Sequence, residues 1–243
     1  MTARLALQPA CRPQRVPIGA SREPVIVIDG VLADPHALVD RAADAEFADA
    51  GSRRGGYPGI RAPAPADYTA MLVEAVEPLI RRVFGLGAAA RGRVDGSFSI
   101  VTTPPEALHP LQRVPHVDTC SPYRIALLHF LCGAEHGGTA FFRHRATGLE
   151  QIPPDAFDRY AEARRAEGAA LPAAAGYPNE TTPGFERIAA FEARCDRLLV
   201  YRSFSLHSGI IPAEATFAAD PRLGRLTANL FVDYLPAGAP ARR

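Results

Sequence analysis

RVPHVDTCSPYRIALLHFLCGAEHGGTAFFRH, residues 113–144, places a histidine and an aspartate two positions apart, ahead of a long apolar run and a pair of glycines. Side chains two apart point to different faces of a helix but to the same face of a strand. The spacing of His116 and Asp118 therefore predicts a strand that presents an imidazole nitrogen and a carboxylate oxygen together. These groups make up two thirds of a 2-His-1-carboxylate metal site.

A third ligand is needed, because an HxD pair alone often occurs by chance. His207 lies just past the apolar segment 198–201, late in the chain, and a Ser-Gly pair follows it. We therefore expect His116, Asp118 and His207 to bind one metal ion. The other histidines have weaker claims: we expect His129 to be a satisfied core residue, and His136 and His144 to face solvent or to support the site.

A polar face is expected on the last apolar segment. Arg225, Thr227 and Asn229 alternate there with Leu226, Ala228 and Leu230, so the polar side chains share one face of a strand. A guanidinium and a hydroxyl on one face suit a carboxylate, since the first gives two hydrogen bonds and the second a third. Arg222 is the competing anchor for such a group.

Short apolar segments recur along the chain and predict a mainly antiparallel β core with flanking helices. We expect helices from Pro35 to about Ala48, from Asp67 to Val83, and from Asp155 to Glu167. Strands are expected at residues 24–32, 96–102, 124–131, 139–142, 198–201 and 226–234.

The segments between these elements set the expected domain organisation. Residues 1–23 read as an irregular arm, residues 24–235 as a single domain, and residues 236–243 as a tail. The Gly/Pro-dense stretch 53–65 is expected to be a loop, and residues 149–190 a helical insertion of the kind that often forms a functional lid.

Composition narrows the choice of partners. The 243 residues are 47% hydrophobic and 22% charged with a formal net charge of +1, which is typical of a globular protein and gives no reason to expect a nucleic-acid or membrane partner. Every basic residue is arginine. The four cysteines lack metal-site spacing and the N-terminus lacks a signal-peptide core, so we expect a cytoplasmic protein with a small-molecule substrate.

An HxD pair, a later histidine and an Arg-x-Thr pair on the following strand, in this order, resemble the Fe(II)/2-oxoglutarate-dependent dioxygenase superfamily. Residues 25–32 look like the entry strand of its prolyl-hydroxylase-like branch, Gly137-Gly138-Thr139 like its Gly-Gly strand, and residues 197–201 like the strand before the distal histidine. The resemblance covers residues 24–235 discontinuously. Within the superfamily, the chain is most similar to an uncharacterised bacterial family.

The resemblance implies a double-stranded β-helix, a cupin-like jelly-roll, with helices outside it. It implies that His116, Asp118 and His207 bind Fe(II), and that Arg225 and Thr227 hold the distal carboxylate of 2-oxoglutarate. With O2, such an enzyme releases succinate and hydroxylates an unactivated C–H bond, here of a small molecule such as an amino acid or secondary metabolite. Tyr57 and Arg61 are candidate substrate contacts, because Arg61 could pair with a carboxylate.

Two alternatives stay open. A cupin-like metal enzyme could use the same triad without 2-oxoglutarate, and a binding protein could keep the jelly-roll without turnover. Arg225 lies eighteen residues after His207, so the intervening segment 210–223 must loop out if Arg225 is the anchor.

Overall fold

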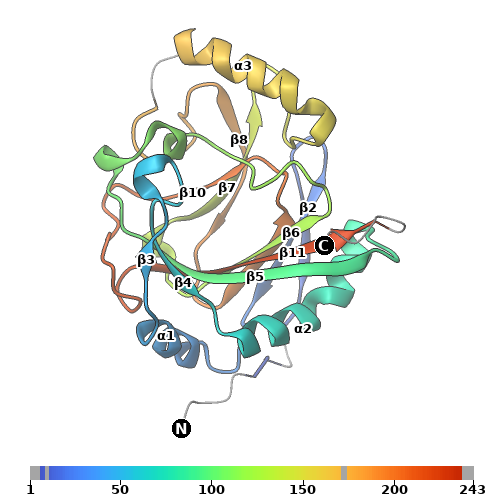
Figure 1. Cartoon of the computed structure of the whole chain (residues 1–243), viewed down its shortest axis with the longest axis vertical. Helices are drawn as coiled ribbons and strands as arrows, with labels where there is room; N and C mark the ends of the chain where they lie inside the picture. The colour runs from blue at the N-terminus through green and yellow to red at the C-terminus, as the bar shows by residue number, and fades with distance from the viewer. Residues whose placement is uncertain (1–5, 9–10, 171–173, 237–243) are drawn as a thin grey trace.

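The computed structural model describes residues 6–8, 11–170 and 174–236. Two antiparallel sheets face each other in this part of the chain (Figure 1). The larger sheet has eight strands in the order β1 (Gln14–Ile18), β2 (Glu23–Asp29), β9 (Arg197–Arg202), β6 (Arg124–Phe130), β11 (Arg225–Leu235), β5 (Ala90–Val101), β4 (Gly59–Pro63) and β3 (Ala48–Asp49). The smaller sheet has the order β10 (His207–Ile210), β7 (Gly138–His144) and β8 (Phe185–Glu192). The expected jelly-roll is thus present.

Strict alternation gives the larger sheet two apolar faces. On β2, Ile26 and Ile28 join the core beneath the helices, whereas Val25 and Val27 join the core between the sheets. On β11, Leu226 and its alternate neighbours face the helices, which leaves Arg225, Thr227 and Asn229 on the face toward the smaller sheet. The alternation predicted for this strand is therefore confirmed.

Two helices cover the outer face of the larger sheet: α1 (Pro35–Ala43) and α2 (Ala66–Phe84). Asp34 begins α1 by accepting hydrogen bonds from the first-turn amides of His36 and Ala37. The third helix, α3 (Phe157–Ala170), packs against the smaller sheet instead, where Tyr160 contacts the apolar cluster beneath it. Short 3-10 helices are η1 (Ser52–Arg54), η2 (Pro105–Ala107), η3 (Pro110–Arg113), η4 (Ala134–His136) and η5 (Pro154–Ala156).

Several expectations about individual segments were wrong. The arm expected through residue 23 contains strand β1, and the loop expected at 53–65 contains β4, which pairs with β5. The insertion at 149–190 contains helix α3 as expected, but also the start of β8, which pairs with β7. The tail expected at 236–243 lies, apart from its first residue, outside the described residues. No helix in the described part of the chain has the length and apolarity to cross a membrane.

Candidate metal centre and its pocket

His116, Asp118 and His207 converge. One potential ligand atom from each lies within 4.8 Å of the other two, and no other group of three such residues in the described ranges does the same. The His207 Nε2 is 3.7 Å from one carboxylate oxygen of Asp118, and the His116 Nε2 is 4.0 Å from the other. Two imidazoles and one carboxylate facing one point are the donor set of a facial triad.

Backbone pairing brings these distant residues together. The amide of His116 donates to the His207 carbonyl and the amide of His207 donates to the His116 carbonyl, both at 2.9 Å. The amide of Asp118 donates to the Ser203 carbonyl at 3.0 Å. The strand predicted for His116 and Asp118 is thus reduced to a single bridge in an extended segment, although the side chains still meet.

A hydrogen bond fixes the ring of His207. Its Nδ1 lies 2.9 Å from the Ser205 carbonyl, which can only accept, so Nδ1 carries the proton and Nε2 keeps a lone pair toward Asp118. Packing around the ring and the neighbouring His207 lower the pKa of His116, although about half of its side chain is exposed. The His116 ring is therefore neutral at neutral pH, as metal ligation requires.

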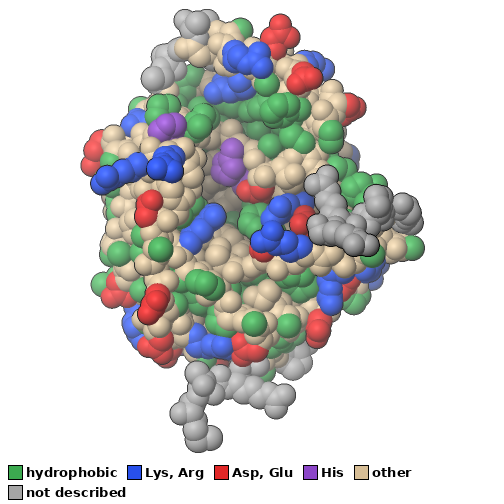
Figure 2. Space-filling view, in the orientation of Figure 1, with side chains coloured by type: hydrophobic (Ala, Val, Ile, Leu, Met, Phe, Trp, Pro, Cys, Tyr) green, Lys and Arg blue, Asp and Glu red, His purple; other side chains and the backbone are tan. Residues whose placement is uncertain are grey.

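The triad opens into a pocket of about 750 Å³ between the two sheets. Figure 2 shows a hollow on this face, with a histidine side chain inside it and arginine side chains around it. Arg225 and Thr227 of β11 line the same pocket. The Nε and Nη2 of Arg225 donate to the carbonyls of His136 and Gly138, at 3.2 and 2.8 Å, and so the guanidinium is held in place.

Arg225 is 4% exposed, and no carboxylate among the described residues pairs with it. Burying a guanidinium without an anion is unfavourable, so the pocket offers an anion site beside the triad. Arg222, the competing anchor, instead forms an exposed ion pair with Asp40 at 2.8 Å and does not line this pocket. The segment between His207 and Arg225 continues past β10 as a loop, as the spacing requires.

Tyr57 and Arg61 both line the pocket. The buried hydroxyl of Tyr57 lies close to Thr227 but makes no hydrogen bond of normal geometry, and burial raises its pKa although the Arg225 and Arg61 charges and Thr227 oppose this. The Arg61 guanidinium carbon lies 4.5 Å from the centre of the Tyr57 ring. The Arg61 guanidinium is therefore stacked on the Tyr57 ring along one wall of the pocket.

The remaining histidines divide as follows. His129 is a satisfied core residue, as expected, since its ring nitrogens bond to Tyr68 and Asp196 at 2.8 and 2.9 Å. His136 and His144 were expected to face solvent or to support the site; both are buried, so only the solvent-facing alternative is wrong. His144 bonds to Glu167 of α3, and only the carbonyl of His136 supports Arg225.

Sequence reasoning missed several pocket residues. Tyr201 of β9 packs edge-on against His207, with ring centres 5.0 Å apart. Tyr201 and Leu199 are two residues apart and share the inner face of the strand, so period-two patterning could have predicted that Tyr201 faces the pocket. Helix α3 contributes Tyr160, Arg164 and Arg165 to the pocket lining. No local sequence pattern indicates this contribution.

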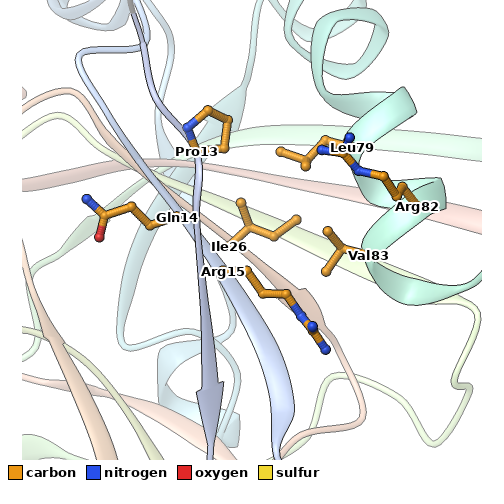
Figure 3. A pocket seen from close by; sticks show the side chains of 7 residues that line it. All are labelled: Pro13, Gln14, Arg15, Ile26, Leu79, Arg82 and Val83. Atoms are coloured by element: carbon orange, nitrogen blue, oxygen red, sulfur yellow. The ribbon is translucent and has the colours of Figure 1, made fainter.

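A second hollow lies on the helix-covered side of the larger sheet, between the N-terminal strands and α2 (Figure 3). Its charged lining residues are Arg15 and Arg82, beside apolar side chains such as Ile26 and Leu79. Its lining has no histidine, cysteine or carboxylate, so this hollow offers none of the ligands of a 2-His-1-carboxylate site.

The paired sheets and the 2-His-1-carboxylate cluster at the pocket define a double-stranded β-helix protein with a candidate metal centre. A family model described as a family of unknown function (DUF6445) matches residues 9–232. The chain belongs to this family. No curated protein matches it.

Solved structures with a similar fold cover most of the chain. The non-heme alpha ketoglutarate dependent epimerase SnoN from nogalamycin biosynthesis is 16% identical, with a TM-score of 0.50 over 90% of this chain and 84% of its own. HygX from Streptomyces hygroscopicus, solved with nickel and 2-oxoglutarate bound, is 12% identical, with a TM-score of 0.50 over 90% of this chain and 85% of its own. At these identities the likeness establishes the fold.

Proposed function

We propose that this chain is an Fe(II)- and 2-oxoglutarate-dependent oxygenase that hydroxylates a small molecule. The observation that carries the proposal is the buried, anion-free guanidinium of Arg225 in the pocket that also holds His116, Asp118 and His207. A metal triad and an anion site in one pocket suit a co-substrate that is both a chelator and a carboxylate. Both neighbours described above are named with this co-substrate, which supports the proposal.

The residues present fit both groups. His116, Asp118 and His207 supply two neutral nitrogens and one anionic oxygen for iron, and leave its other positions to exogenous ligands. Arg225 and the Thr227 hydroxyl would donate to the distal carboxylate of 2-oxoglutarate. The partnerless hydroxyl of Tyr57 could donate a further hydrogen bond there, which moves Tyr57 from the expected substrate contacts toward the co-substrate.

When bound, the iron would activate O2, which is the oxidant, and 2-oxoglutarate would be oxidised to succinate and CO2, so that one oxygen atom enters succinate and the other enters the substrate. The chain supplies position and exclusion of water. Ser205 keeps the Nε2 lone pair of His207 toward the metal site, and the His136 and Gly138 carbonyls hold the Arg225 guanidinium. The aromatic rings of Tyr201 and Phe141 pack on His207 and exclude water behind it.

Anaerobic titration with Fe(II) and then 2-oxoglutarate tests the proposal. The chelate should produce a weak visible charge-transfer band, and Arg225→Gln should weaken 2-oxoglutarate binding by about 10- to 100-fold. Arg222→Gln is the matched control and should bind 2-oxoglutarate like the parent. Absence of the band in metal-loaded protein, with metal-dependent turnover that consumes no 2-oxoglutarate, would favour the cupin-like alternative.

A further inference from the structure

The pocket has an excess of positive charge. Its lining includes four arginines, Arg61, Arg164, Arg165 and Arg225, but its only carboxylate is Asp118. The proposed function assigns Asp118 to the metal and Arg225 to 2-oxoglutarate. A metal dication and a 2-oxoglutarate dianion cancel each other, so they leave the charge of the other arginines uncompensated.

One of these arginines is already paired. The Arg164 Nη1 lies 2.5 Å from Glu167, and its guanidinium carbon lies 4.9 Å from the centre of the Phe185 ring. Arg61 and Arg165 form no ion pair with any carboxylate in the described part of the chain. They remain available to a ligand.

The fold directs Arg61 toward the ligand space. On β4, Ile60 and Ala62 pack on the helix side of the larger sheet, so Arg61 between them faces the smaller sheet. Arg61 pairs with Ser99 of β5, and Ser99 pairs with Thr227 of β11. Since neighbouring strands are about 4.8 Å apart, the Arg61 and Thr227 backbones lie about 10 Å from each other on one face.

The Arg61 backbone therefore lies two strands away from Thr227, although its guanidinium stacks on the Tyr57 ring. The inner face of a jelly-roll is normally apolar, and an arginine there needs a reason. Arg61 is exposed, and stacking on the Tyr57 ring holds its guanidinium along the pocket wall. An arginine restrained in this way, with unpaired N–H groups, is preorganised for an anion.

The part of the pocket lining that is assigned neither to the metal nor to 2-oxoglutarate is largely apolar, apart from the arginines. Leu111 is 62% exposed although it is a large hydrophobic side chain, and it lies at the pocket beside Val117 and Ile211. An exposed leucine at a binding pocket is suited to an apolar ligand surface.

From this arrangement we infer that the substrate is a small molecule with an anionic group, a carboxylate or a phosphate, on an apolar body, and that Arg61 binds the anionic group. The inference rests on the proposed function, because it assigns Arg225 to 2-oxoglutarate.

Matched ligand pairs test the charge requirement. Protein loaded with Ni(II) and saturated with 2-oxoglutarate, so that Arg225 is occupied, is titrated calorimetrically with apolar carboxylic acids and their primary amides, and with phosphate monoesters and the parent alcohols. We expect members of one anionic series to bind about 10- to 100-fold more tightly than their neutral partners. The preferred series identifies the group.

Arg61→Gln should abolish this preference, Arg61→Lys should keep part of it, and the exposed arginine variant Arg53→Gln should keep all of it. Binding of 2-oxoglutarate by the parent protein and by Arg53→Gln is measured separately and should be equal, so that failure of this inference and failure of the proposed function are distinguished. The inference is overturned if no anionic compound binds, if neutral partners bind equally well, or if Arg61→Gln retains the preference. Loss of 2-oxoglutarate binding by the parent protein would instead contradict the proposed function.

Discussion

His116 and His207 exchange two backbone hydrogen bonds of 2.9 Å, and their rings lie 4.7 Å apart between centres. A reciprocal pair of this kind fixes both Cα positions relative to each other, so the separation of the two imidazoles does not depend on a metal ion. The triad is therefore largely preorganised by the chain itself.

Replacing a triad ligand should release the metal without unfolding the protein. We expect His207→Ala to lower Ni(II) or Fe(II) affinity by at least about 10- to 100-fold, the loss seen when even a partner of a ligand is removed. Equilibrium dialysis with elemental analysis measures this. His36→Ala removes an exposed histidine of α1 and should leave the metal content unchanged; equal metal retention by both variants would contradict the site.

Tyr57→Phe separates binding from stability. The lost hydroxyl would donate to an anion, so 2-oxoglutarate should bind about 10- to 100-fold more weakly. The apo protein should be as stable as the parent or more stable, because a buried polar atom without a partner is removed. Tyr123→Phe, at an exposed position, is the control for calorimetry and thermal unfolding. A destabilised variant with normal 2-oxoglutarate affinity would assign the hydroxyl a structural role.

Glu150 should stabilise the fold in a pH-dependent manner. Burial acts to raise its pKa, but hydrogen bonds from Ser21, Ala20 and Arg143 outweigh burial and hold the pKa at about 2. Because the folded pKa lies below the ordinary value of 4.5, the stabilisation is complete above about pH 4.5 and is lost as the pH falls toward 2.

The shift corresponds to about 3 kcal/mol of unfolding free energy at neutral pH. Glu150→Gln should therefore lose up to about this amount in urea unfolding at pH 7, with the difference from the parent shrinking below pH 4. The exposed Glu46→Gln variant should match the parent throughout. A difference that stays constant down to pH 2 would show that charge is not the cause.

Glu167 should hold α3 against the smaller sheet. Its carboxylate contacts the buried His144 at 2.9 Å and Arg164 at 2.5 Å, and these hydrogen bonds lower its pKa although burial opposes them. Glu167→Gln should weaken docking by about 1–2 kcal/mol, which raises amide exchange in α3 by about 5- to 30-fold. Glu162→Gln on the exposed face is the control. Metal and 2-oxoglutarate affinity should not change, whereas substrate KM should rise.

The alternation of polar and apolar residues along strands explains which features of the fold and site could be predicted from the sequence. The alternation around Thr227 correctly oriented β11, because this strand is apolar on one face and polar on the other. The order of His116, Asp118, His207 and Arg225 pointed to one pocket, and the structure brings all four to its lining. These features are local in sequence or follow from chain order.

The rest depends on contacts between distant segments. Strand β4 was hidden by Gly and Pro, yet a side chain at Gly59 would approach the Ile100 carbonyl to 2.0 Å, so glycine there reflects close strand packing. The burial of His144 depends on α3, and the burial of Tyr57 depends on the neighbourhood of Thr227. No local periodicity reports such contacts.

The Gly137-Gly138 pair shapes two sites at once. A methyl group on Gly137 would lie 1.9 Å from the Ile210 carbonyl at the end of β10, and one on Gly138 would lie 2.2 Å from the Phe191 carbonyl of β8. The Gly138 carbonyl also accepts a hydrogen bond from Arg225. The start of β7 thus packs closely on the strand that carries His207 and also holds the arginine of the anion site, so a single short segment aligns the two ends of the pocket.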